Sequence, residues 1–357
     1  LTTQPPAPTL GLGLGNATYQ TILNFSSLTL TIAQNLVLTT TSNTATIGNI
    51  LLHLPSANVN NPVFNFNSGT ITIGNALQTS DPNDANIDHY TLLVINYASV
   101  SSSAQFLMSP SAGNTSTLNL NGANALAPDG QAGYIDLYGG NSGTTTINYG
   151  GLGNQEVYTS TTAYSTTSRF STAPTGLDRS PAMYQNITFQ GGALTKKADG
   201  GNLTVDGNLS ILPAATETVD FATNSPIVTV GGNFVSNAGS TLNQGGTGTM
   251  SISGTSDNAG ILNQTGSGNI TFTGALNNSA SSAIIAQTGT GAIIASAGIS
   301  NAGTISQGSG TIGSITVTGN LTNTGTRTQG TGNISVSADL SNSGTLTLGS
   351  ANLTVTG

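Results

Sequence analysis

The chain of 357 residues contains no cysteine and no tryptophan, and only 5% of its residues are charged. Without cysteine it can form no disulfide, no thiolate metal site and no cysteine nucleophile. A typical soluble domain carries roughly 25% charged residues. Hydroxyl and amide groups therefore have to solvate most of this surface.

Positive charge is especially scarce. The chain has 5 lysine and arginine residues against 13 aspartate and glutamate residues, which gives a formal net charge of −8. This balance argues against a nucleic-acid partner, because a basic patch is needed to neutralise phosphates, and also against docking on anionic lipid. No apolar run reaches the roughly 20 residues that span a bilayer, so we expect no membrane insertion.

A short repeat is present instead. Each copy has a strand of alternating apolar residues, an asparagine among small residues, and a threonine-rich strand that often ends in glutamine. Successive copies begin 25, 22, 20, 23, 22, 19 and 19 residues apart. A period near 20 residues that contains strands and no helical pattern is typical of a stacked solenoid, so the sequence predicts an all-β fold, a β-solenoid. The first strands begin at Leu203, Val228, Met250, Ile270, Ile293, Ile315, Ile334 and Leu353.

Recurring amides form two columns when the repeats are aligned. Alternation sends apolar side chains inward and Ser and Thr outward, and parallel stacking about 4.8 Å apart turns identical amides into hydrogen-bonded ladders. We expect each amide to bond to the copies above and below it. The predicted ladder residues are Asn237, Asn258, Asn301, Asn323, Asn342, Gln244, Gln264, Gln287, Gln307 and Gln329, with Asn278 in the same column.

Two further features of the columns lead to expectations. Glycines follow the asparagine column by two residues, where a sharp corner would favour positive φ. They are Gly239, Gly260, Gly303, Gly325 and Gly344. Arg327 falls in an inward column with Leu242 and Ile305. Because an unpaired inward arginine is very costly, we expect either that this column faces outward locally or that the register slips.

The regularity of the pattern divides the chain. Residues 1–15 predict an extended lead-in, 16–149 an irregular solenoid with loop insertions, 150–185 an insertion or flap, and 186–357 the regular repeats. The last strand begins a repeat that Gly357 cuts short. We therefore expect further chain or another copy to continue the stack end to end.

An acidic stretch offers a candidate metal site. Asp81, Asn83, Asp84 and Asp88 lie within eight residues and carry the oxygen ligands that Ca²⁺ prefers. The stretch lacks the glycine and terminal glutamate of a helix–loop–helix site, and a solvated turn explains the same residues. Ca²⁺ is the only cofactor that the sequence suggests.

An aromatic group occupies residues 150–185. Tyr158, Tyr164, Phe170 and Tyr184 could form a platform that binds sugar or protein. They could equally seal the flank of the solenoid or cap one end.

Catalytic groups do not cluster. Parallel β-helix enzymes need grouped carboxylates, whereas Asp136, Glu156 and Glu217 are scattered. His53 lies in an apolar run and is expected to be a strand residue. We therefore expect no enzyme. The alternative is a carbohydrate-active β-helix, a polysaccharide lyase or tailspike-like depolymerase, whose activity would depend on Asp136 or Glu156.

The segments 207–210, 319–325 and 340–346 read GNLS, GNLTNTG and LSNSGTL. These repeats resemble the filamentous-haemagglutinin-like family of bacterial surface proteins, which are secreted by the two-partner or autotransporter routes. The resemblance covers about residues 186–357. It implies a right-handed parallel β-helix on the cell exterior that serves adhesion, aggregation or scaffolding.

Together these observations predict an extracellular structural or adhesive segment of a cell-surface or filament-forming protein. The expected partners are further copies or a continuation of the same chain, and a host-cell, neighbouring-cell or matrix surface. No nucleic acid is expected among them.

Overall fold

The computed structural model describes residues 201–357 without a gap, together with the strands and short adjoining segments that precede them. The described residues are 22–32, 36–38, 44–53, 63–66, 69–73, 90–95, 105–108, 113, 115–120, 124–128, 134–136, 143–151, 154–157, 159, 184–192, 195–198 and 201–357. They contain strands, bends and turns and no helix. The chain forms two compact units, Leu1–Ile187 and Thr188–Gly357, and the boundary lies within strand β13 (Asn186–Phe189).

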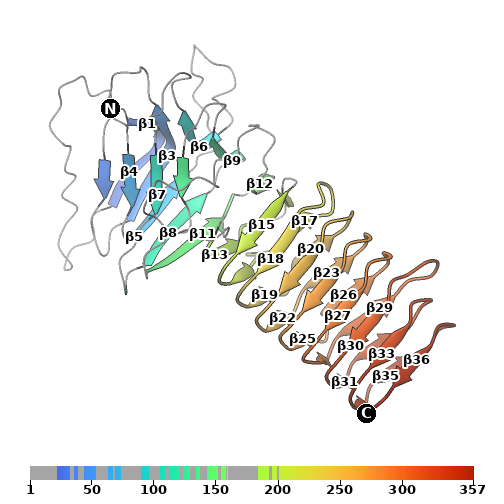
Figure 1. The fold of residues 1–357 in the computed structure, drawn as a ribbon. Coiled ribbons are helices and arrows are strands. Elements are labelled where there is room, and N and C mark those ends of the chain that lie inside the picture. The colour runs from blue at the N-terminus through green and yellow to red at the C-terminus, as the bar shows by residue number, and fades with distance from the viewer. Residues whose placement is uncertain are drawn as a thin grey trace, which may run out of the picture. The chain divides into compact units, whose positions relative to one another are not determined.

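The second unit is a parallel β-solenoid, as the repeat predicted. Its first ladder is an eight-stranded parallel sheet whose strands lie side by side in Figure 1. Leu203 pairs with Val228, Val228 with Met250, and so on through every predicted strand start to Leu353. The strands are β15 (Asn202–Val205), β18 (Ile227–Val230), β21 (Met250–Ile252), β24 (Ile270–Phe272), β27 (Ile293–Ala295), β30 (Ile315–Val317), β33 (Ile334–Val336) and β36 (Leu353–Val355).

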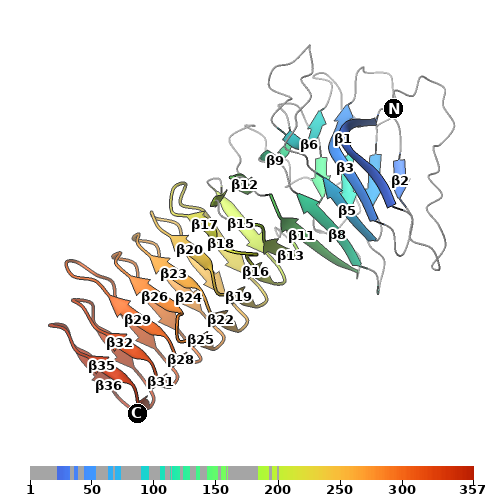
Figure 2. The same cartoon turned by 180° about the vertical axis from the view of Figure 1, so that it is seen from behind.

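Two further parallel ladders complete each coil (Figure 2). The second ladder comprises β16 (Leu209–Ile211), β19 (Phe234–Ser236), β22 (Ser256–Asn258), β25 (Leu276–Asn278), β28 (Ile299–Asn301), β31 (Leu321–Asn323) and β34 (Leu340–Asn342). The third ladder comprises β14 (Thr195–Ala198), β17 (Glu217–Phe221), β20 (Ser240–Gln244), β23 (Ile261–Gln264), β26 (Ile284–Gln287), β29 (Thr304–Gln307), β32 (Thr326–Thr328) and β35 (Thr345–Thr347).

The first unit also stacks its strands in parallel. β1, β3, β5, β8 and β11 form one ladder, β2, β4, β7 and β10 a second, and β3, β6, β9 and β12 a third. His53 lies in β3 opposite Ile95, as a strand residue. The strands are β1 (Ile22–Ile32), β2 (Leu36–Leu38), β3 (Thr44–His53), β4 (Val63–Phe66), β5 (Gly69–Ile73), β6 (Tyr90–Ile95), β7 (Gln105–Met108), β8 (Thr115–Leu120), β9 (Asn124–Pro128), β10 (Tyr134–Asp136), β11 (Thr144–Tyr149) and β12 (Gln155–Val157).

The core of the second unit consists of apolar columns that run from coil to coil. Val205, Val230, Ile252 and Phe272 are all buried on the inward face of the first ladder. Each fully buried side chain of this size contributes about 1.5–3 kcal/mol. The threonines between them stay outside, so alternation along each strand separates the core from the surface.

Four of the five corner glycines serve a different purpose from the one predicted. Of the five, Gly239 alone has a positive φ, 86°, so the expectation of positive φ was wrong for the other four. A Cβ built on Gly325 would lie 2.1 Å from the carbonyl oxygen of Gly303 in the preceding coil. Close stacking of successive coils, and not the backbone angle, therefore requires glycine there.

Candidate functional site

The asparagine column forms a continuous ladder inside the second unit. Asn258 Nδ2 donates to Asn278 Oδ1 at 2.8 Å, Asn278 to Asn301 at 2.7 Å, Asn301 to Asn323 at 2.6 Å and Asn323 to Asn342 at 2.6 Å. The Nδ2 groups of Asn258, Asn278, Asn301 and Asn323 also reach main-chain carbonyls at the corner. The prediction of an amide ladder is confirmed for these residues.

Asn237 is not part of this ladder, which corrects the prediction. Ser236 stacks on Asn258, while Asn237 is exposed one residue further along the chain. The carbonyl of Asn237 accepts hydrogen bonds from Ser240 N at 3.1 Å and Ser240 Oγ at 2.6 Å. Aligning the repeats by residue type put Asn237 in the asparagine column. The alternation along β19 instead turns Ser236 inward, and Asn237 follows it as an exposed residue.

The glutamines stack in register but bond differently from the asparagines. Gln307 Nε2 donates to Gln287 Oε1 at 2.9 Å. Otherwise the glutamine amides donate to turn carbonyls, such as Gln264 to Gly268 at 3.0 Å and Gln287 to Gly291 at 2.8 Å. The longer side chain reaches across the turn that follows its own strand, so a glutamine ladder was only partly correct.

Arg327 points into the core, and neither predicted escape occurs. It pairs in unbroken register with Ile305 and Leu346 and is 1% exposed. Its Nη1 donates to the carbonyls of Ile305 at 3.4 Å and Thr328 at 3.5 Å, whereas Nη2 has no hydrogen-bond partner. Burial lowers the pKa of the guanidinium to about 10. A slip of one residue would turn Thr326 and Thr328 inward. The stability that the correct register gives the whole coil therefore outweighs the cost of burying one arginine.

A second buried group lies at the start of the third ladder. Lys196 on β14 is 1% exposed and Glu217 on β17 is 2% exposed. Lys196 is opposite Val219, and Glu217 lies two residues before Val219 on the same inward face. Neither carboxylate oxygen of Glu217 has a hydrogen-bond partner. Burial is the main reason that the pKa of Glu217 rises to about 7 and the pKa of Lys196 falls to about 8, and their mutual attraction opposes both shifts.

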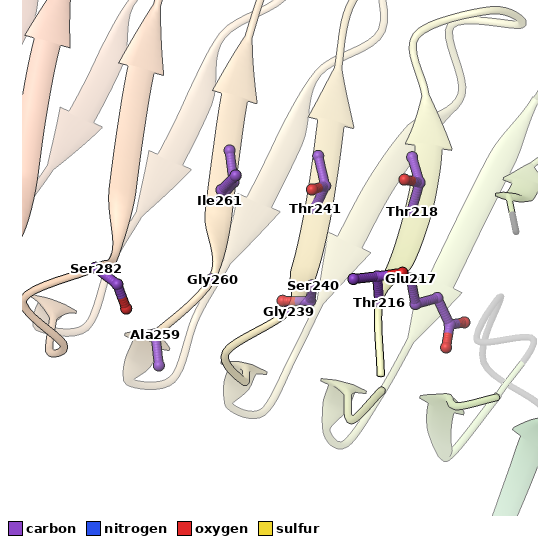
Figure 3. A pocket seen from close by; sticks show the side chains of 10 residues that line it. All are labelled: Thr216, Glu217, Thr218, Gly239, Ser240, Thr241, Ala259, Gly260, Ile261 and Ser282. Carbon is purple, nitrogen blue, oxygen red and sulfur yellow. The ribbon is translucent and has the colours of Figure 1, made fainter. Parts of the chain in front are cut away.

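A hollow of about 320 Å³ lies beside Glu217. Figure 3 shows Thr218, Thr241 and Ile261 side by side on successive strands, while the carboxylate of Glu217 extends away from them, beyond Thr216. Gly239 and Gly260 lack side chains and so leave the hollow open. It offers hydroxyls and main-chain groups to a neutral polar ligand, because its one charged lining residue is buried.

The outward face of the third ladder carries a column of β-branched residues. Consecutive members pair in register from β14 to β35. We name it the Thr/Ile column. It comprises Thr195, Thr218, Thr241, Ile261, Ile284, Thr304, Thr326 and Thr345.

The other predicted sites fall mostly outside the described residues. These are the acidic stretch with Asp81, Asn83, Asp84 and Asp88, and the aromatic residues Tyr158, Tyr164 and Phe170. No group of three or more histidine, cysteine, aspartate or glutamate residues that could hold a metal ion occurs among the residues whose positions are described.

Tyr184 is the one member of the aromatic group that can be placed. It is fully buried, and its hydroxyl lies 2.8 Å from the hydroxyl of Tyr149. A side chain in this position cannot form an exposed platform, so Tyr184 does not belong to one.

The described part of the chain also contains no helix that is long and apolar enough to cross a membrane. Sequence reasoning named Glu217 only as one of several scattered acids and did not pair it with Lys196. The signal was available in the alternation of Glu217, Val219 and Phe221, which points all three inward. No protein-family model, no curated protein and no solved structure matches this chain.

Proposed function

We propose that the chain is an extracellular structural and adhesive segment of a cell-surface or filament-forming protein. The observation that carries this proposal is the unbroken register of the first ladder through eight strands. Such stacking makes a solenoid whose stability comes from many equivalent interfaces between neighbouring coils. A long, regular body of this kind suits a stalk or scaffold.

The chemistry of the repeated columns supports the same proposal. Inward columns hold Val, Leu, Ile, Phe, Asn and Gln, and none of them repeats a reactive group. The Thr/Ile column presents hydroxyls and methyl groups over eight strands with no charge among its members. A repeated column of uncharged groups of this kind suits attachment or aggregation, in which many weak contacts act together.

The carbohydrate-active alternative has less support. Glu217 has the raised pKa that a general acid needs, but its side chain is buried and no second acid lines the hollow. Asp136 and Glu156 lie in β10 and β12 of the first unit. Release of unsaturated sugar ends from acidic polysaccharides, lost on mutation of Asp136 or Glu156, would favour this alternative.

Adhesion can be tested with the full chain coupled to beads. We expect the beads to aggregate or to attach to cell or matrix-coated surfaces. The double substitution Thr241→Lys/Thr304→Lys on the Thr/Ile column should weaken this aggregation and attachment. The matched control is Thr229→Lys/Thr316→Lys on the outward face of the first ladder, which should adhere as before. Beads that stay dispersed and unattached with the unmodified chain would contradict the proposal.

A further inference from the structure

Lys196 and Glu217 are the only two ionisable side chains that face the interior from the described parts of β14, β17 and β20. Lys197 and Asp220 on β14 and β17 pair with each other on the outward face. β20 sends Ser240, Leu242 and Gln244 inward. The pair therefore occupies a water-poor interior beside Ala198, Val219 and Phe221.

The geometry brings the ends of the two side chains within reach of each other. Lys196 is one strand away from Glu217 and offset by two residues. A strand spacing of about 4.8 Å and a rise of about 3.3 Å per residue therefore place their Cα atoms about 8 Å apart. Both side chains are long, and both point inward. The two charges interact electrostatically.

From this placement we infer that Lys196 and Glu217 form an intramolecular isopeptide bond, which joins two successive coils of the solenoid through an amide. The carboxylate oxygens of Glu217, which have no hydrogen-bond partner, identify its carboxyl group as the acceptor. This is a modification of the chain itself and does not depend on the proposed function.

The chemistry balances without an oxidant, a reductant or a co-reactant. The lone pair of Nζ attacks Cδ of Glu217, and a new C–N bond forms as one C–O bond breaks. A proton from Nζ leaves with the hydroxyl group as water. The reaction needs a neutral amine and a protonated acid, and burial shifts the pKa of both groups in those directions.

The folded chain also supplies the proximity that the reaction needs. Well-oriented groups in one molecule reach effective concentrations on the order of 10⁵–10⁸ M. A desolvated lysine is a stronger nucleophile than a hydrated one. The product replaces two buried ionisable groups with one neutral amide, which removes the desolvation penalty of both charges.

Intact mass spectrometry of the folded full chain tests the inference directly. We expect a mass lower than that of the sequence by one water molecule. Trypsin should no longer cleave the peptide bond after Lys196. The peptide of residues 180–197 should stay joined to the peptide of residues 198–327 through the new amide. Digestion of an unlinked chain separates these two peptides, because trypsin cuts after Lys197.

Two matched variants complete the test. Lys196→Met should restore the full mass, whereas Lys197→Met, which alters the outward neighbour in the same strand, should keep the loss of water. A full mass for the folded, unmodified chain after incubation at neutral pH would overturn the inference, whether or not the variants fold. Loss of water that persists in Lys196→Met would overturn it as well.

Discussion

At the scale of single residues, the buried ionisable groups stand apart from the rest of the second unit. Its surface uses hydroxyls and amides, yet Arg327, Lys196 and Glu217 lie inside. Sequence reasoning recognised the conflict at Arg327 because one cation interrupts an aliphatic column. The sequence could not decide whether Arg327 faces inward or outward, since its orientation depends on the sum of all contacts in the coil and not on one residue.

Replacing Arg327 with an apolar residue should stabilise its coil. Arg327→Met fills similar space with a flexible apolar side chain and removes a buried cation whose Nη2 has no partner. We expect the free energy of local opening to rise by about 1–4 kcal/mol, as when buried ionic groups give way to apolar ones. Hydrogen exchange of the β32 amides measures it. Thr326→Met on the outward face is the control, with an expected change within about 0.5 kcal/mol. A lower protection of β32 in Arg327→Met would contradict the argument.

Glu217 should make stability depend on pH once Lys196 is removed. In Lys196→Met the pKa of Glu217 stays above its ordinary value of 4.5, because burial raises it and the attraction of the lysine is lost. From pH 4.5 upward through pH 7 the folded state then binds more protons than the unfolded state, so stability falls as pH rises through this window.

The measurement is the melting temperature of Lys196→Met below pH 4.5 and above pH 7. Other carboxylates also titrate, so the comparison is with Lys196→Met/Glu217→Gln, which lacks the raised group. Relative to this double variant, Lys196→Met should be less stable at the higher pH. Parallel pH profiles for the two variants would show that Glu217 does not titrate as the burial argument requires.

At the scale of elements, hydrogen bonding distinguishes the two amide columns. The short asparagine side chain reaches the next coil, so Asn258 to Asn342 bond in series. The glutamine side chain, one methylene longer, donates mainly to turn carbonyls, such as those of Gly268 and Gly291, and only Gln307 bonds to another glutamine of the column. The sequence predicted both columns from their spacing. The sequence could not predict that the two columns bond to different partners. The partner depends on how far a side chain reaches across the corner of the coil, and the spacing of residues does not describe that.

Breaking the asparagine ladder in its middle should cost more than breaking it at its end. Asn301→Ala removes the donor to the buried Asn323 Oδ1 and the acceptor for Asn278. We expect a loss of about 1–3 kcal/mol, the cost of a buried polar group left without a partner, seen as faster hydrogen exchange in β28 and β31. Asn342→Ala is the control. Asn342 is exposed, so water can replace its contact with Asn323. Equal effects of the two substitutions would mean that the ladder bonds add little to stability.

At the scale of the whole chain, the repeat was the most reliable signal. All eight predicted strand starts of the second unit pair with one another in register, because each coil depends mainly on contacts with its neighbours. The first unit was harder to predict from sequence. One of its strands, β3, pairs with β5 through Thr44–Ile47 and with β6 through Ile50–His53. A strand that serves two ladders has no fixed period, so spacing alone could not reveal its role.

Register between coils leads to a prediction about deletions. Removing residues 270–292 takes out β24, β25 and β26 and joins Asn269 directly to Ile293. Because Ile270 pairs with Ile293 and Asn278 with Asn301, the remaining coils can restack with Asn258 on Asn301 and Gln264 on Gln307. Asn269 then directly precedes β27, as it directly precedes β24 in the intact chain. We expect the shortened chain to fold with parallel β-structure and to lose only the stability of one coil.

A shorter deletion should be more harmful than this longer one. Removing residues 270–281 leaves part of a coil, so β26 would follow Asn269 at the position where β24 belongs and every inward column would be misplaced. Circular dichroism and thermal melting of the two deletion variants distinguish an ordinary globular core from a solenoid governed by register. If the chain behaved as an ordinary globular core, stability would follow the number of residues removed. For a solenoid governed by register, the 270–292 deletant should have the higher melting temperature although it lacks more of the chain.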